Sequence, residues 1–392
     1  MHVGYALLTL FPGRVGGSET NAREVLEQFA DGRGPERVTV LANRHVMNAY
    51  AGLERGPVRL CHVRSYRPGD SDATRALAMA AARALPRRAA RDVPAGLDVL
   101  HHPVTVPIPE PRVPNVVTLF DVQHHDLPQF FSRAERAHRR WAYDGAARAA
   151  DVVVATSAFS AERIAAHVGV ARELIEVVHL GIDHERFSPD HGPEDEALRP
   201  RLPERFVVYP ANLWPHKNHA ALLEAFAHIG DEGLHLVLTG QAYGREAELA
   251  AHAERLGMKA RVHHLGHLPA PQVPALYRLA TAMVFPSLYE GFGAPPLEAM
   301  ACGLPVAASD RASLPEVCGQ AALAFDPASG RELGRAIEQI TQDKQLRATL
   351  RASGLDRAAG FTWSAAAERH AVIYQRAAAT AGGPAGSSPT WP

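Results

Sequence analysis

Short apolar runs alternate with helical patterns along almost the whole chain of 392 residues. In such an alternation each helix carries the chain back to begin the next strand in the same direction, which predicts parallel sheets covered by helices. The chain is also longer than a single core of about 250–300 residues, so two α/β domains are expected. Strands are predicted at residues 3–10, 38–42, 99–101, 116–120 and 151–156, and then at 206–210, 235–239, 261–265, 281–285, 305–308 and 322–325.

The boundary between the two series is predicted from composition. Residues 188–203 are rich in Pro, Asp and Glu and have no apolar period, which is typical of an interdomain linker. This gives a first α/β domain at residues 1–187 and a second at 204–362. A last helical pattern covers about 363–380, and the small, polar residues of the tail at 381–392 are predicted to be disordered.

The composition also limits partners and location. The formal net charge is −1, so no basic footprint favours nucleic acid. No apolar run approaches the ~20 residues of a transmembrane helix, and the N-terminus lacks the charged region of a signal peptide. Cys61, Cys302 and Cys318 are odd in number and widely spaced, so they form neither a disulfide framework nor a zinc pattern. A cytoplasmic protein without a transmembrane segment is therefore predicted.

Two glutamates in the second half of the chain have the spacing of a ligand site. Glu290 and Glu298 are separated by a Gly-Phe-Gly turn and by Pro295 and Pro296. The proline pair suits the first turn of a helix, which places Glu298 one turn in and Glu290 in the preceding loop. The backbone amides of residues 291–293 and the helix N-terminus would favour an anion. The alternative is a strand–loop–helix connection with two solvated carboxylates.

A lysine marks a second candidate segment. Lys217 is one of only three lysines, with Lys259 and Lys344, and it follows the predicted strand at 206–210 where a helix begins. A lysine at that position adds a point charge to a helix end that already favours anions. The alternative is a surface lysine at a helix start.

Two segments in the first half end predicted strands. Gly16 and Gly17 follow the first strand and open a helix, so a ligand could approach the backbone closely there. Asp121 and His124 follow the strand at 116–120, at the end where ligands bind in open α/β sheets. The alternative for the latter pair is capping of the next helix.

Taken together, these segments resemble the retaining glycosyltransferases of family 4, the glycosyl transferases group 1, which have the GT-B fold. The resemblance spans nearly the whole chain, from Gly16 to Trp363. It implies two Rossmann-like domains that face each other across a cleft, with the C-terminal helix crossing back to the first domain. The first domain would bind the acceptor and the second the nucleotide-sugar.

The resemblance also implies roles for individual residues. In the family's Glu-x7-Glu motif the first glutamate lies beside the donor sugar and the second binds the ribose, which gives these roles to Glu290 and Glu298. Lys217 matches a diphosphate-binding lysine, and Asn212 stands where the family often has an arginine. The donor would be held by Gly16, Gly17, Asn212, Lys217, His267, Leu268, Glu290, Gly291, Phe292, Gly293, Leu297 and Glu298.

In the first domain the match is less complete. Related members often read Thr-Ile-His-Asp-Leu-Gln-His where this chain has Phe120 in place of the first histidine. Asp121 and His124 still match, and the resemblance places them at the donor sugar or the acceptor hydroxyl. The predicted catalytic residues are therefore Glu290, Lys217, Asp121 and His124.

The predicted reaction is metal-independent transfer of a hexosyl group from a UDP- or GDP-sugar to an acceptor hydroxyl, with retention of configuration. The acceptor is expected to be a small aglycone, a saccharide or a lipid-linked saccharide, in natural-product or polysaccharide biosynthesis. The protein is expected to be a monomer or homodimer, with no tightly bound cofactor. An epimerase of the same fold and an inactive nucleotide-sugar-binding subunit are the alternatives.

One motif points to a different class of glycosyltransferase. Asp70 and Asp72 match the Asp-x-Asp pattern that binds a metal in the GT-A fold. They precede a predicted helix in a Gly-rich loop, where helix N-capping explains them more simply. No metal site is therefore predicted.

Overall fold

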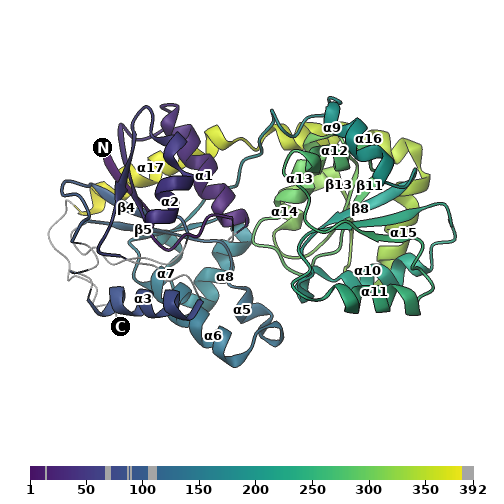
Figure 1. The fold of residues 1–392 in the computed structure, drawn as a ribbon, viewed down its shortest axis with the longest axis horizontal. Coiled ribbons are helices and arrows are strands. Elements are labelled where there is room, and N and C mark those ends of the chain that lie inside the picture. The colour runs from purple at the N-terminus through teal and green to yellow at the C-terminus, as the bar shows by residue number, and fades with distance from the viewer. Residues whose placement is uncertain (14–15, 67–71, 86–87, 89–90, 105–112, 382–392) are drawn as a thin grey trace. The chain divides into compact units, whose positions relative to one another are not determined.

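The computed structural model describes residues 1–13, 16–66, 72–85, 88, 91–104 and 113–381. The chain divides into two compact units (Figure 1). Unit 1 comprises Met1–Gly181 and Trp363–Pro392, and unit 2 comprises Ile182–Thr362. Each unit is built around one fully parallel sheet.

Unit 1 contains a seven-stranded sheet in the order β3-β2-β1-β4-β5-β6-β7. The strand order reverses between β1 and β4, which are hydrogen-bonded neighbours. The strands are β1 (His2–Leu7), β2 (Arg37–Ala42), β3 (Val58–His62), β4 (Val99–His102), β5 (Asn115–Leu119), β6 (Val152–Ala155) and β7 (Ile175–Val177). The helices are α1 (Gly17–Ala30), α2 (Arg44–Ala49), α3 (Asp72–Ala84), α5 (Gln123–Asp126), α6 (Arg133–Arg139), α7 (Gly145–Arg148), α8 (Ala158–Val168) and α17 (Trp363–Ala381).

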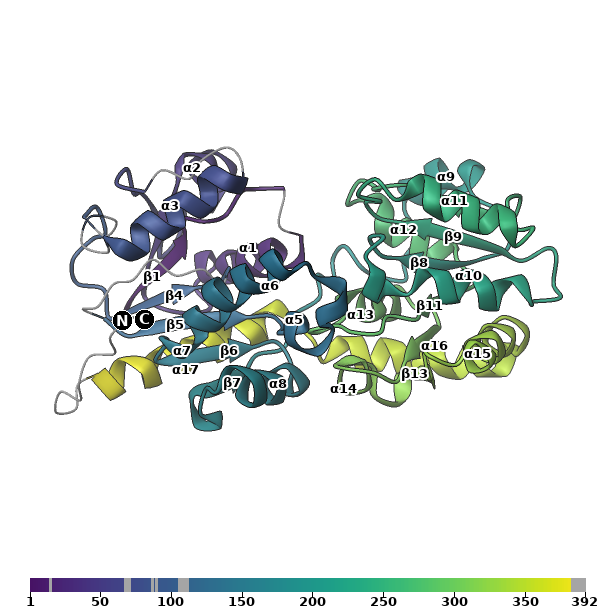
Figure 2. The same ribbon diagram turned by 90° about the horizontal axis from the view of Figure 1, so that it is seen from below.

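The last helix completes the core of unit 1. In Figures 1 and 2 α17 lies along α1 and against β4 and β5. Trp363, Ile373 and Tyr374 of α17 are buried in the same cluster as Tyr5 and Phe29. Burial of aromatic and aliphatic side chains from the end of the chain therefore stabilises the sheet formed by its beginning.

Unit 2 contains a six-stranded sheet in the order β10-β9-β8-β11-β12-β13, with the reversal between β8 and β11. Figure 1 shows α10 and α11 on one face of this sheet and α12 and α13 on the other. The strands are β8 (Phe206–Pro210), β9 (His235–Thr239), β10 (Val262–His264), β11 (Ala282–Phe285), β12 (Val306–Ser309) and β13 (Ala322–Phe325). The helices are α9 (Pro193–Leu198), α10 (His219–Ala227), α11 (Glu246–Arg255), α12 (Gln272–Leu279), α13 (Ala294–Ala301), α14 (Leu314–Cys318), α15 (Gly330–Gln342) and α16 (Lys344–Ala359).

The segment expected to be a linker, residues 188–203, differs from the prediction because it is part of unit 2. It contains α9, whose Asp195 is buried and accepts hydrogen bonds from the Arg278 guanidinium of α12, including one of 2.9 Å from Nε. The Arg278 Nη1 also donates to the Ser188 carbonyl. An acidic residue that pairs with a buried arginine gives no apolar periodicity, so composition alone suggested a solvated segment.

The remaining expectations concern the chain ends and membranes. Helix α17 continues to Ala381, and the rest of the tail predicted at 381–392 lies outside the described residues. Asp70 also lies outside them, and the side chain of Asp72 is not described. Among the helices that the structure describes, none combines the length and apolar character needed to cross a membrane.

Candidate functional site

The candidate donor site lies where the strand order of unit 2 reverses. Lys217 follows β8 and Glu290 follows β11, and these two parallel strands are neighbours. In an open α/β sheet the loops at the carboxyl ends of such strands diverge and leave space for a ligand. The topology therefore brings together two residues that are 73 positions apart in the sequence.

The turn that carries Lys217 is anchored at its backbone. The short 3₁₀ helix η6 (Pro215–Lys217) ends at Asn218, a left-handed residue with φ +61°. The Asn218 amide donates to the carbonyl oxygens of Pro286 and Pro327, at 3.2 and 2.9 Å. The buried Tyr209 hydroxyl donates to the Lys217 carbonyl at 2.7 Å. These bonds hold the turn against the loop that follows β11.

Lys217 and Glu290 form the central ion pair. Lys217 Nζ lies 2.5 Å from Glu290 Oε1, and the two side chains are 17% and 13% exposed. A pair this little exposed is screened less than a surface pair, so each group fixes the position of the other. The ammonium keeps two further N–H groups, since three protons are available on Nζ.

The glycine turn between Glu290 and α13 is shaped by α14 and the residue before it. The Ser313 hydroxyl lies 3.0 Å from the Glu290 carbonyl oxygen and 2.7 Å from that of Phe292. Gly293 caps α13 with φ +98°, and a Cβ atom there would lie 2.7 Å from Leu314 Cδ2. Only glycine fits this backbone angle and this contact without displacing its neighbours.

Glu298 lies one turn into α13, and its carboxyl group is buried among protein atoms. The Tyr277 hydroxyl donates to Glu298 Oε2 at 3.3 Å. Burial raises the pKa of Glu298 to about 7, although the Arg186 charge and the tyrosine bond act in the opposite direction. A carboxyl group with this pKa can accept hydrogen bonds when ionised and donate one when neutral. Leu297, the residue before it, is fully buried.

Other predicted donor-site residues of unit 2 lie in neighbouring loops. Asn212 Oδ1 accepts a 2.7 Å hydrogen bond from the Gln241 backbone amide, which ties the loop after β8 to the loop after β9. His267 is exposed and Leu268 is buried in the loop after β10. The Gly266 carbonyl at the start of that loop accepts from the Gly240 amide at 2.8 Å. The structure thus joins these loops at one edge of the sheet.

In unit 1, Gly16 and Gly17 lie at the reversal between β1 and β4. Gly16 is the N-cap of α1 with φ +69°, and Gly17 is the first residue of the helix. Both are exposed, and a Cβ atom at either position would have no described neighbour within 4 Å. The turn therefore leaves backbone accessible at a helix N-terminus.

Asp121 and His124 have local partners. Asp121 Oδ1 accepts from the Gln123 backbone amide at 3.0 Å at the start of α5. His124 is fully buried, and its Nε2 lies 3.1 Å from Asp144 Oδ1, while His125 Nε2 lies 2.8 Å from Oδ2. Burial opposes ionisation of Asp144, but the two histidine hydrogen bonds outweigh it and hold the pKa of Asp144 below its usual range.

This histidine–aspartate cluster also has the composition of a metal site. The possible ligand atoms of His124, His125 and Asp144 lie within 4.8 Å of one another. Among the residues that the structure describes, they form the one group of three or more such side chains. Metal-bound histidines usually donate their second ring N–H to a partner. His124 Nδ1 is buried without a hydrogen-bond partner, so the cluster fits a metal poorly. Two N–H groups bound to one carboxylate account for its geometry.

Two α/β units, each with a parallel sheet whose strand order reverses once, define a class of fold. The structure of HepE from Anabaena with UDP and glucose covers 97% of this chain and 99% of its own, with a TM-score of 0.70 and 21% identity. The fold is therefore GT-B. The model of glycosyltransferase family 4 matches residues 15–186, and that of glycosyl transferases group 1 matches 193–357. The chain belongs to this glycosyltransferase family.

Two curated relatives represent the sequence similarity. O-antigen chain mannosyltransferase B of Escherichia coli is 30% identical over 288 residues, 71% of this chain and 74% of that protein. D-inositol 3-phosphate glycosyltransferase 1 of Catenulispora acidiphila is 34% identical over 247 residues, 58% of each chain. The chain spans about a quarter of the length of the serotype-specific mannosyltransferases WbdA of Escherichia coli.

Several residues around the site carried no signal in the sequence. Tyr209 lies in the predicted strand 206–210, and its hydroxyl both supports the nearby lysine turn and lies 3.0 Å from Ser287 Oγ in the loop after β11. Ser313 and Arg186 act on Glu290 and Glu298 from distant segments. A helix cap can be predicted from the spacing of nearby residues. Contacts between distant segments can be predicted only when the order of the strands in the sheet is known.

Proposed function

We propose that unit 2 binds a UDP- or GDP-sugar and that the protein transfers the sugar to an acceptor hydroxyl with retention of configuration. The observation that carries the proposal is the Lys217–Glu290 ion pair at the strand reversal, with Glu298 one helical turn farther along. A cation, a sugar-facing carboxylate and a second carboxylate in this order match the diphosphate, sugar and ribose of such a donor. The names of the mannosyltransferase and inositol glycosyltransferase relatives support this class of reaction.

Lys217 would stabilise charge on the leaving diphosphate. The bond between the sugar carbon and the diphosphate oxygen breaks, and the acceptor oxygen bonds to the same face of that carbon. The acceptor proton passes to the leaving phosphate oxygen. An ammonium already fixed in place stabilises the developing charge without reorganisation, and one such group typically contributes about 3 kcal/mol. Glu290 would orient the sugar rather than act as a nucleophile, because its carboxylate is paired with Lys217.

The remaining predicted residues support this arrangement. Asn212 would orient the lysine turn through the Gln241 loop, and the loop of His267 and Leu268 would hold the base. Gly16 and Gly17 of unit 1 would approach the diphosphate or the acceptor. His124 would position α5 rather than touch the substrate, since it is buried against Asp144. A nucleotide-sugar donor also favours the cytoplasm as the site of reaction.

The test is a thermal-shift panel of UDP, GDP and their hexose conjugates with wild type and Glu298→Gln. A ligand that binds the folded state raises the melting temperature. We expect one nucleotide series to stabilise the wild type and to lose most of its effect in Glu298→Gln. The control Glu232→Gln changes an exposed carboxylate of the same unit and should leave the shift intact. No stabilisation by any nucleotide would overturn the donor assignment.

Activity measurements then separate the reaction from its alternatives. Lys217→Met should lower kcat/KM for transfer by at least about 100-fold, because it removes the cation at the leaving group. Conversion of the donor sugar without any acceptor would instead identify an epimerase. Donor binding without transfer to saccharide, lipid-linked or small acceptors would identify a binding subunit.

A further inference from the structure

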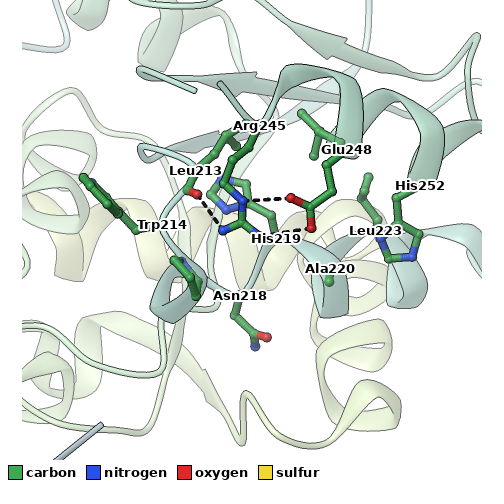
Figure 3. A pocket seen from close by; sticks show the side chains of 11 residues that line it. Leu213, Trp214, Asn218, His219, Ala220, Leu223, Arg245, Glu248 and His252 are labelled. Atoms are coloured by element: carbon green, nitrogen blue, oxygen red, sulfur yellow. Dashed lines mark hydrogen bonds and ion pairs between the residues drawn. The ribbon is translucent and has the colours of Figure 1, made fainter. Parts of the chain in front are cut away.

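A pocket in unit 2 is lined by residues of the turn that carries Lys217. The Lys217 ammonium reaches Glu290, whereas Trp214, Pro215 and Asn218 of the same segment line a pocket of about 240 Å³ (Figure 3). The opposite wall comes from α10 and from the start of α11. Lys217, Glu290 and Glu298 do not line this pocket. It is therefore distinct from the proposed donor-binding residues.

One wall of the pocket presents a fixed planar polar pair. Arg245 Nε and Nη2 donate to the two carboxylate oxygens of Glu248 at 2.8 and 3.0 Å, and Nη1 donates to the Leu213 carbonyl at 3.1 Å (Figure 3). The side chains are 38% and 65% exposed, so both remain accessible. A guanidinium and a carboxylate held in one plane offer donors and acceptors side by side, as neighbouring hydroxyl groups require.

One lining residue, Trp214, packs against the exposed ring of Tyr243, which does not itself line the pocket. Trp214 is 44% exposed and Tyr243 is 53% exposed, and their ring centroids lie 4.6 Å apart. Tyr243 has φ +50°, a left-handed angle that is unusual for a bulky residue. The loop thus holds a strained tyrosine against a tryptophan whose ring still meets solvent. Such strain is concentrated at ligand-binding segments.

A histidine in the wall has a buried ring nitrogen without a hydrogen-bond partner. His219 lines the pocket and is 8% exposed. Its ring hydrogen-bonds the Ala211 backbone, and its Nε2 has no hydrogen-bond partner. Because Nε2 has none, Nδ1 makes the backbone bond as a donor, which leaves Nε2 as an acceptor in the neutral ring.

We propose that this pocket binds one pyranose unit of a saccharide. The Trp214 ring would cover the apolar C–H face of the sugar, while Arg245 and Glu248 would bind neighbouring hydroxyls. Beyond their mutual bonds, Arg245 keeps N–H groups and Glu248 keeps carboxylate lone pairs that neighbouring hydroxyls can use. The pocket thus adds a saccharide subsite beside the turn that presents Lys217, and this assignment does not depend on the identity of the donor.

The test is isothermal titration of the full chain with α-linked mannotriose, maltotriose and chitotriose. We expect one of these saccharides to bind, with a Kd raised at least about tenfold by Trp214→Ala and less by Trp214→Phe. The matched control Trp141→Ala removes an exposed tryptophan of unit 1 and should leave the Kd unchanged. Stabilisation by nucleotide should persist in Trp214→Ala, which separates this pocket from the donor site.

Three results would overturn the proposal. The first is the absence of binding by all three saccharides, and the second is binding that Trp214→Ala does not weaken. The third is loss of saccharide and nucleotide binding together in a variant that melts like the wild type, which would assign the pocket to the donor. Arg245→Gln tests the same wall if Trp214→Ala fails to fold, and it should weaken saccharide binding by a similar factor.

Discussion

Acidification should weaken unit 1 through the histidines that α17 and β4 bury. His101, His102 and His370 are at most 2% exposed. Burial, the largest cause, lowers the pKa of both His102 and His370 to about 4 from an ordinary value of 6.5. His370 Nδ1 donates to the Ala366 carbonyl at 2.8 Å, a bond that raises the pKa of His370, but burial outweighs it. Protonation must therefore accompany unfolding when the pH falls.

The sign and size follow from linkage. A folded-state pKa below the unfolded value gives stability that is complete above about pH 6.5 and is lost as the pH falls toward 4. At pH 5 each of His102 and His370 would cost about 2 kcal/mol, and below pH 4 about 3 kcal/mol. Together they would remove about 4 kcal/mol at pH 5, against a typical total of about 5–15 kcal/mol for a domain.

Hydrogen exchange resolved on peptides of α17 and β4 measures this loss within unit 1. The opening free energy, corrected for intrinsic exchange, should fall by at least about 4 kcal/mol between pH 7 and pH 5 in the wild type, because His101, whose pKa burial also lowers, adds to the loss from His102 and His370. In His370→Met, which keeps an apolar side chain of similar size, the fall should be smaller by about 2 kcal/mol. His62→Asn changes an exposed histidine of β3 and is the control. A wild-type opening free energy that is independent of pH, or an equal flattening in His62→Asn, would refute the reasoning.

Three further predictions concern unit 2. Nucleotide affinity measured by titration calorimetry should rise up to about tenfold per pH unit toward pH 7 and then level off. The reason is that Glu298, with a pKa of about 7, binds ribose hydroxyls best when it is ionised. Glu298→Gln should abolish this pH dependence. Gly293→Ala should lower the unfolding free energy in urea by at least about 2 kcal/mol more than Gly257→Ala, since both have positive φ but only the former meets a leucine side chain. Asp195→Ala should cost about 3 kcal/mol in the same assay, because it leaves the buried Arg278 charge without its carboxylate partner. Equal costs for Gly293→Ala and Gly257→Ala, or no loss for Asp195→Ala, would contradict these accounts.

Much of the sheet structure could be predicted because buried parallel strands are nearly continuous apolar runs. The predicted strands at 206–210, 235–239 and 322–325 coincide with β8, β9 and β13. The two strands missed in unit 1, β3 and β7, are the edges of their sheet, and half-exposed or three-residue strands have little apolar pattern. The edge strands β10 and β13 of unit 2 were predicted, so an edge position by itself does not hide a strand.

The sequence predicted the local backbone setting of the candidate site residues, whose roles stay predictions. Glu290 and Glu298 were recognised by their spacing around a glycine turn, and the structure adds that Glu290 pairs with Lys217. The partner of His124 could not be found in the same way, because Asp144 lies 20 residues away on the turn before α7. Contacts that depend on sheet order or helix packing leave no local pattern.

The return of the chain to unit 1 has a consequence for synthesis. Unit 2 is one continuous segment, whereas unit 1 requires both the first 181 residues and α17. A ribosome therefore releases every residue of unit 2 before the helix that covers Tyr5 and Phe29 exists. Until then the nascent sheet exposes apolar surface to chaperones and to other chains. A premature stop before Trp363 would leave unit 2 complete and would destabilise unit 1, although most of unit 1 is encoded at the start of the gene.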